Sequence, residues 1–292
     1  MGAGIRTCRR STLFALAAIA TVATACAGSG SKPASSAPTT AAHTSTAVKL
    51  GSGGTYAAVG SSYAAGPGIP SQLPGTCARS DHNYPHLVAA ALHLDLTDVS
   101  CSGATTANAV DTPQGTNPPQ LDAVTARTTL VTMTIGGNDV GYIATALACG
   151  QPHGSGCSAD PATLDREFTE LHGSLTSLIA DVRAKAPSAT IVLVTYPRLV
   201  PTNACPALSY TPAGTALVGS MGQRLQQVFV AVAKDTGVRL ADPYAVGDGH
   251  GPCAPASARW IDGKVAPGAF PYHPTALGHL EMARLVEHAL GH

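Results

Sequence analysis

Charged and aromatic residues are scarce in this chain of 292 residues. Only 12% of the residues are charged and 4% are aromatic, and 17 Lys and Arg residues balance 17 Asp and Glu residues. A chain without excess basic charge lacks the electrostatic surface on which nucleic-acid binding depends, so we expect no nucleic-acid partner. The hydrophobic share is nevertheless 45%, which excludes disorder throughout the chain. With 31 glycines and 22 prolines, we expect a turn-rich fold packed with small aliphatic side chains.

A long hydrophobic run is also lacking, since no stretch approaches the roughly 20 apolar residues that a membrane-spanning helix needs. The apolar stretch 13–23 is shorter and follows Arg6, Arg9 and Arg10, with no acidic residue before it. A basic start, a short apolar stretch and small residues form an export signal, so we predict a signal peptide over residues 1–25. Its removal would leave 17 − 3 = 14 basic residues against 17 acidic ones, a net charge of −3.

The segment after this stretch supports two interpretations of Cys26. Ala23-Thr24-Ala25-Cys26 resembles a bacterial lipobox, whose cysteine becomes diacylated, but it also fits an ordinary small-x-small cleavage site. Residues 26–53 are rich in Ser, Thr, Ala and Pro, as expected of a flexible tether. We therefore expect an exported protein, either a cell-envelope lipoprotein or freely secreted, with membrane attachment only through a lipidated Cys26.

Six cysteines follow the tether, and an even number in an exported chain favours a disulfide framework. Six cysteines allow 15 connectivities, of which pairing in sequential order is the simplest. A metal site is disfavoured because no Cys-x-x-Cys pair occurs. The six are Cys77, Cys101, Cys149, Cys157, Cys205 and Cys253.

Residues 54–292 alternate between short apolar runs typical of buried strands and longer segments with helical apolar spacing. This alternation predicts a single α/β domain, a three-layer α/β/α sandwich with a central parallel sheet. The predicted strands are 56–59, 130–135, 191–194 and 238–241, and the predicted helices are 84–94, 164–182, 217–232 and 275–290.

Polar residues follow the predicted strands, at the edge of the sheet where such folds place their functional loops. Ser62 follows the first strand and could act as a nucleophile, while His273, just before the last helix, could move its proton. The backbone N–H groups of Ser62 and Gly103 and the side-chain amide of Asn138 could form an oxyanion hole. Together these groups supply what acyl transfer requires.

The order of these groups along the chain resembles that of the conserved blocks of the SGNH (GDSL-type) hydrolases. The matching residues are Ser62, Gly103, Asn138 and His273. The resemblance implies a flavodoxin-like three-layer sandwich and these four residues as Ser, Gly, Asn and His of the family. The cysteine pattern is similar to that of secreted actinobacterial lipases and esterases with three disulfides, which implies Cys77–Cys101, Cys149–Cys157 and Cys205–Cys253.

Two positions depart from the family pattern. Ser61 stands where the family has the Asp of its Gly-Asp-Ser block, and Phe270 stands where it has the Asp that supports the catalytic histidine. In similar family members a main-chain carbonyl upstream of the histidine accepts its Nδ1–H, which implies the carbonyl of Phe270 or Pro271 here. We therefore predict a Ser–His pair with backbone support. The alternative is a carboxylate that reaches the site by another route, from Asp262 or Asp242.

These observations predict an exported serine esterase or lipase that hydrolyses carboxylic esters through a Ser62 acyl-enzyme, with His273 as general base and acid. The expected partner is a small-molecule or lipid ester, and we expect a monomer with no metal and no organic cofactor. Two alternatives keep the mechanism, a polysaccharide O-deacetylase and a phospholipid acyl hydrolase. A third, a non-catalytic envelope binding protein on the same fold, stays open because the supporting Asp is missing.

Overall fold

The structure is a computed structural model that describes residues 47–48 and 50–292. These residues belong to one compact unit. The predicted signal peptide, Cys26 and most of the predicted tether lie outside the described residues. Within the described part of the chain, every helix is too short or too polar to cross a bilayer.

Five parallel strands form one sheet in the order β2–β1–β3–β4–β5. Four of them coincide with predicted strands, but β2 was missed because its sequence, Asp-Leu-Thr-Asp, has a carboxylate at each end and no apolar run. The strands are β1 (Thr55–Gly60), β2 (Asp95–Asp98), β3 (Thr128–Thr134), β4 (Thr190–Val194) and β5 (Arg239–Ala241).

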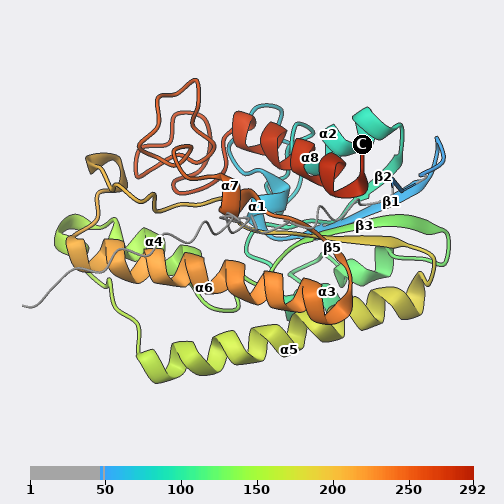
Figure 1. Cartoon of the computed structure of the whole chain (residues 1–292), viewed down its shortest axis with the longest axis horizontal. Coiled ribbons are helices and arrows are strands. Elements are labelled where there is room, and N and C mark those ends of the chain that lie inside the picture. Colours follow the sequence, from blue (N-terminus) through green and yellow to red (C-terminus); the bar gives the residue numbers. More distant parts are fainter. Residues whose placement is uncertain (1–46, 49) are drawn as a thin grey trace, which may run out of the picture. The chain divides into compact units, whose positions relative to one another are not determined.

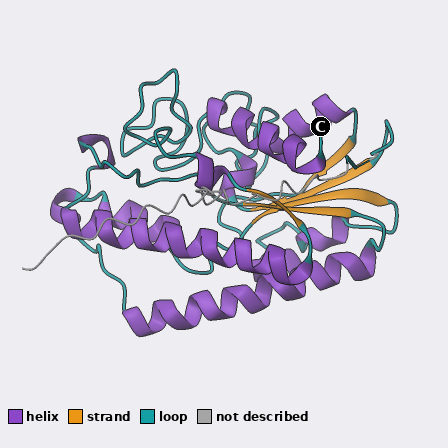
Figure 2. Cartoon of the chain, in the orientation of Figure 1, coloured by secondary structure: helices purple, strands orange, loops and turns teal. Residues whose placement is uncertain are grey.

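Helices cover both faces of this sheet, as Figures 1 and 2 show, so the architecture is the predicted three-layer α/β/α sandwich. Two short helices, α1 and α7, follow β1 and β5, and three single 3-10 turns lie at Gln120–Ala123, Pro152–Gly154 and Pro206–Leu208. The α-helices are α1 (Ser62–Ala65), α2 (Tyr84–Leu92), α3 (Thr106–Val110), α4 (Tyr142–Cys149), α5 (Pro161–Lys185), α6 (Pro212–Thr236), α7 (Pro243–Val246) and α8 (Ala276–Leu290).

The core is divided by the sheet into two clusters, because successive strand residues face opposite sides. Tyr56 and Ala58 of β1 pack against α2 and α8, whereas Ala57 and Val59 pack in the larger cluster under α4, α5 and α6. All four residues are buried. The two-sided burial explains why the strands are continuous apolar runs rather than alternating ones.

The long helices begin where the sequence supplies a capping side chain followed by proline. Asp160 accepts the backbone N–H of Thr163 at 2.8 Å at the start of α5, and Thr211 caps α6 in the same way. A proline at the first helical position needs no backbone hydrogen bond there and has the right φ. Thr275 caps α8, so this helix begins at Ala276, three residues after His273, and gives that residue a rigid neighbour.

Three disulfide bonds join cysteines that are consecutive in the chain: Cys77–Cys101, Cys149–Cys157 and Cys205–Cys253. The first ties the loop after α1 to the loop after β2, and the second ties the end of α4 to the segment before α5. Each bond therefore fastens a loop at the carboxyl edge of the sheet, where the polar residues that follow the strands are gathered.

Candidate active site

The four residues predicted from the strand ends come together around one cavity of about 370 Å³. Ser62 begins α1 after β1, Gly103 lies between β2 and α3, Asn138 lies between β3 and α4, and His273 precedes α8. Parallel strands present their carboxyl ends on one edge of the sheet, so segments that are far apart in the sequence meet there.

Ser62 and His273 are in direct contact and nearly buried, with exposed fractions of 7% and 4%. The Nε2 atom of His273 lies 2.8 Å from Oγ of Ser62, and its Nδ1 atom lies 2.9 Å from the carbonyl oxygen of Pro271. A carbonyl oxygen only accepts, so Nδ1 carries the proton and Nε2 is the acceptor for the Ser62 hydroxyl. The ring is thus held in the tautomer that removes a proton from the serine.

Burial lowers the pKa of His273 to about 4, and the hydrogen bond to the Pro271 carbonyl opposes this shift in the upward direction. The imidazole is therefore neutral at pH 7, which is the form that acts as a base.

The residue in the family's Asp position, Phe270, has no side-chain group that can accept a hydrogen bond from His273. Its ring contacts the ring of His273 edge to face, with centroids 5.4 Å apart, and its carbonyl accepts the backbone N–H of His273 at 3.0 Å. Of the two carbonyls considered from the sequence, that of Pro271 is the one on Nδ1.

Asp262 and Asp242 have other partners. Asp262 is buried and accepts hydrogen bonds from Arg259 at 3.1 Å and from the backbone N–H of Gly268 at 3.2 Å. Asp242 accepts from Thr195, Gln226 and the backbone N–H of Ala245. Neither carboxylate is hydrogen-bonded to His273.

Three potential donors converge on the cavity beside the serine. The backbone N–H groups of Ser62 and Gly103 donate to no other residue in the described chain. Gly103 has φ +86°, a conformation that favours glycine. The side-chain amide of Asn138 donates to the carbonyl of Ala104 at 2.8 Å, which orients the amide and leaves its second N–H for a ligand.

Asp139 joins the two loops that carry these donors. It accepts the backbone N–H of Thr106 at 3.0 Å and also the Thr106 hydroxyl. The carboxylate thus ties the loop after β3 to the beginning of α3 and holds Gly103 and Asn138 at the same side of the cavity.

Two side chains that hold backbone groups next to the site were not identified from the sequence, Tyr196 and Gln120. Tyr196 follows β4, accepts the backbone N–H of Gly137 at 2.9 Å and shares a hydrogen bond with Oγ of Ser61 at 3.1 Å. Gln120 pairs with both backbone groups of Gly60, at 2.8 and 3.0 Å. Tyr196 was detectable in principle, since it stands two residues beyond a predicted strand, whereas nothing near Gln120 in the sequence points to β1.

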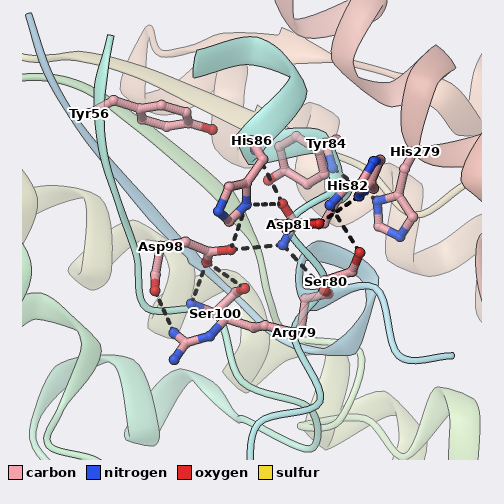
Figure 3. Close-up of polar contacts among 12 residues, drawn as sticks. Tyr56, Arg79, Ser80, Asp81, His82, Tyr84, His86, Asp98, Ser100 and His279 are labelled. Atoms are coloured by element: carbon pink, nitrogen blue, oxygen red, sulfur yellow. Dashed lines mark hydrogen bonds and ion pairs between the residues drawn. The ribbon is translucent and has the colours of Figure 1, made fainter. Parts of the chain in front are cut away.

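The far end of the serine's helix α1 is held by a polar network drawn in Figure 3. The carbonyl of Ala65 accepts the backbone N–H of Ser80 at 2.9 Å and the side-chain amide of Asn83 at 3.2 Å. Asn83 in turn donates to Asp98, at the end of β2, at 2.7 Å, and Asp98 also accepts the Ser100 hydroxyl at 2.6 Å. The edge strand therefore contributes directly to the position of the serine.

The cavity wall away from these polar groups is apolar. Ile143, Ala144 and Leu147 present one face of α4 to it, and the ring of Phe270, 49% exposed, stands at its rim. Pro67 and Ala78 complete the lining. Among the described residues, no group of three or more His, Cys, Asp or Glu side chains is placed to hold a metal ion.

Comparison with known proteins identifies the family of the chain. Residues 58–280 match the GDSL-like Lipase/Acylhydrolase family. The chain is 34% identical over 252 residues to Lipase 2 of Streptomyces coelicolor, covering 81% of this chain and 85% of the relative.

Two solved structures are also similar. The phospholipase A1 of Streptomyces albidoflavus NA297 has 29% sequence identity and a TM-score of 0.65, over 81% of this chain and 99% of that one. The extracellular lipase of Streptomyces rimosus has 26% identity and a TM-score of 0.65, over 80% of this chain and 99% of that one. The resemblance to SGNH hydrolases seen in the sequence is confirmed: the chain belongs to the GDSL-like lipase/acylhydrolase family and is an ester hydrolase.

Proposed function

We propose that this protein is an exported serine esterase or lipase whose acyl-enzyme forms on Ser62. The observation that carries the proposal is the 2.8 Å contact between Oγ of Ser62 and Nε2 of His273, on the wall of an apolar cavity and with Nδ1 already hydrogen-bonded. A serine is activated when its hydroxyl is hydrogen-bonded to a base and a third group in turn orients that base.

In the first half of the reaction, Oγ of Ser62 attacks the ester carbonyl and Nε2 of His273 takes the hydroxyl proton. The imidazolium then gives that proton to the leaving alcohol, and the acyl group stays on Ser62. In the second half, His273 takes a proton from water, the hydroxide attacks the acyl-enzyme, and the proton returns to Ser62 as the acid leaves.

The negative charge on the carbonyl oxygen is stabilised by the N–H groups of Ser62 and Gly103 and by the Asn138 amide. These donors belong to folded segments and do not reorganise during the reaction, which is what makes such a site effective. One donor of this kind contributes about 2.7–4 kcal/mol.

The support of His273 by the Pro271 carbonyl defines a Ser–His pair without a carboxylate. A carbonyl dipole fixes the tautomer and the ring orientation, but it stabilises the imidazolium less than a full negative charge would. The pair therefore depends on accurate placement of the Pro271 carbonyl.

The apolar wall formed by Ile143, Leu147 and Phe270 supports an ester with an aliphatic acyl chain as the substrate class. The similar phospholipase A1 of S. albidoflavus favours phospholipid acyl hydrolysis as the second candidate function. A polysaccharide deacetylase needs polar groups for the sugar, and these walls offer few.

Export is supported by the three disulfides and by the similarity to an extracellular lipase. Lipidation at Cys26 is the form of export that we propose, with free secretion as the alternative. Labelling cells with a fatty-acid probe separates the two: the wild type takes up label and Cys26→Ala does not.

The catalytic proposal is tested by treating the purified protein with a fluorophosphonate and mapping the adduct by mass spectrometry. We expect the adduct on Ser62, and neither adduct nor ester hydrolysis in Ser62→Ala. An unlabelled Ser62 in protein that is folded would refute the proposal and leave the envelope binding protein as the better interpretation. Hydrolysis of p-nitrophenyl esters, a phospholipid and acetylated xylan in parallel then ranks the substrate classes.

A further inference from the structure

The turn that precedes α8 contains an unusual backbone conformation. The backbone N–H of His273 donates to the carbonyl of Phe270 at 3.0 Å, so residues 270–273 form a tight turn. Pro271 holds the second position and Tyr272 the third, with φ +60°. Proline followed by a positive φ is the pattern of a type II turn, whose third position normally requires glycine. Here it is a tyrosine, and a fully buried one.

This conformation decides where the Pro271 carbonyl points. Type I and type II turns differ chiefly by reversal of their central peptide, which in this turn joins Pro271 to Tyr272. The observed form lets the Pro271 carbonyl accept from Nδ1 of His273. A type I turn would relieve Tyr272 of its positive φ and would direct that carbonyl away from the imidazole. The less favourable conformation is thus the one that the Ser–His pair needs.

The hydroxyl of Tyr63 holds this turn in place. It donates to the carbonyl of Tyr272 at 2.5 Å, and its ring packs beside that of His273, with centroids 5.1 Å apart. Burial raises the pKa of Tyr63 well above its ordinary value, so the hydroxyl keeps its proton and remains a donor. Tyr63 follows Ser62 directly in α1, so the same short helix presents the nucleophile and binds the turn that carries the base.

Other contacts also hold the turn. The backbone N–H of Tyr272 donates to the carbonyl of Gly263 at 3.2 Å, and the Tyr272 hydroxyl donates to the carbonyl of Leu208 at 2.8 Å. The backbone N–H of Phe270 donates to the carbonyl of Pro67, two residues beyond the end of α1, at 3.1 Å. Tyr63 differs from these in that it stands next to the nucleophile in α1 and binds the turn through a side-chain hydroxyl, which a single substitution removes.

We infer that Tyr63 is a positioning residue for His273: its hydroxyl holds the Tyr272 carbonyl, and with it the turn in which the Pro271 carbonyl fixes the Nδ1–H tautomer of the imidazole. This inference rests on the proposed function, because it assigns a role in the Ser62–His273 pair. It predicts that loss of one hydroxyl, without loss of the ring, uncouples the imidazole from its backbone support.

The experiment uses Tyr63→Phe, with p-aminophenylalanine introduced at position 63 as a rescue variant that restores a neutral para N–H donor. We expect Tyr63→Phe to lower kcat for a p-nitrophenyl ester roughly ten- to hundredfold, with KM changed less than about threefold, on the scale of one strong hydrogen bond. The rescue variant regains most of the lost rate. Nitrogen-15 NMR of the labelled imidazole at pH 7 shows the Nδ1–H tautomer of His273 in the wild type and a mixture of tautomers in Tyr63→Phe.

Tyr56→Phe is the matched control. Tyr56 is equally buried and its hydroxyl makes one hydrogen bond of 2.7 Å, to Thr132 inside the sheet. We expect Tyr56→Phe to lower the melting temperature about as much as Tyr63→Phe does, and to leave kcat and the NMR spectrum of His273 unchanged. If both variants lose rate in proportion to stability, the effect of Tyr63 is structural and the inference is wrong.

Different outcomes refute the proposed function and the role of Tyr63. Wild-type protein that is not labelled at Ser62 by a fluorophosphonate refutes the proposed function. Normal labelling of the wild type, together with equal kcat and an unchanged His273 tautomer in Tyr63→Phe, leaves the proposed function intact and refutes the role of Tyr63. If Tyr63→Phe does not fold, the p-aminophenylalanine variant still decides, because its NMR spectrum must match that of the wild type.

Discussion

Replacing Asp262 by Asn tests whether a carboxylate takes part in the reaction. In a Ser-His-Asp triad, neutralising the Asp lowers kcat by about 10⁴-fold. Here the carboxylate of Asp262 accepts from Arg259 and from the backbone N–H of Gly268, and His273 has the Pro271 carbonyl instead. We therefore expect Asp262→Asn to keep kcat within about tenfold of the wild type, on the scale of a modest indirect effect.

The same substitution should lower stability, because the side chain of Asp262 is 3% exposed and paired with Arg259. An amide keeps one acceptor but loses the charge, and a hydrogen bond to a charged partner contributes about 1.5–3 kcal/mol. For a domain of this size, such a loss lowers the melting temperature by roughly 3–12 °C. We therefore expect Asp262→Asn to lower the melting temperature while kcat stays within about tenfold of the wild type.

The assay measures kcat with a p-nitrophenyl ester at 20 °C, well below the melting temperature of the variant, and normalises it to fluorophosphonate-reactive protein. Asp242→Asn serves as the parallel variant, since the Asp242 carboxylate accepts hydrogen bonds from Thr195 and Gln226 and has none with His273. A fall in kcat near 10⁴-fold for either variant, in protein that is folded and correctly disulfide-bonded, would refute a Ser–His pair supported by backbone alone.

Three further predictions concern the donors, the cavity and pH. Asn138→Ala should lower kcat by about 10²–10³-fold with a smaller change in KM, because it removes one oxyanion donor, and steady-state kinetics check this. Leu147→Trp should fill the end of the cavity and shift the preferred p-nitrophenyl ester toward shorter acyl chains, and an unchanged chain-length profile would show that the acyl group lies elsewhere. Because burial lowers the pKa of His273 to about 4, kcat/KM should stay level down to about pH 5 and fall as the pH drops through 4, since only the neutral imidazole is a base. A midpoint of kcat/KM near pH 6.5 would contradict this assignment. The same pKa shift means that the unfolded chain binds more protons than the folded one between pH 4 and 6.5, so the contribution of His273 to stability decreases as the pH falls through that window.

Much of the site was predictable because it follows from local patterns. Four residues stand just after a strand or just before a helix, and parallel strands bring such segments together whatever the details of packing: Ser62, Gly103, Asn138 and His273. The strands themselves were visible as continuous apolar runs, except for β2. That strand lies at the sheet edge, and its carboxylate Asp98 serves the network behind α1 rather than the core.

The supporting side chains were not predictable in the same way. Gln120 reaches Gly60 across 60 positions of sequence, and Tyr196 reaches Ser61 across 135, with no local motif at either partner. Hydrogen bonds of this kind depend on how loops pack after the sheet has formed. The place of Tyr196 just beyond a predicted strand made it a candidate for the site, but the sequence did not indicate its partners.

By itself, the amino-acid sequence determined the layer architecture and the chemical groups of the site, because both depend on periodicity and on which residues stand where a strand ends. It left two carbonyls and two carboxylates as candidates for the support of His273. Only the tertiary structure decided among them, through the positive φ of Tyr272 and the hydroxyl of Tyr63, 209 positions away. The direction of a single peptide plane is set by contacts from distant segments, and that direction is what makes the Pro271 carbonyl the partner of the imidazole.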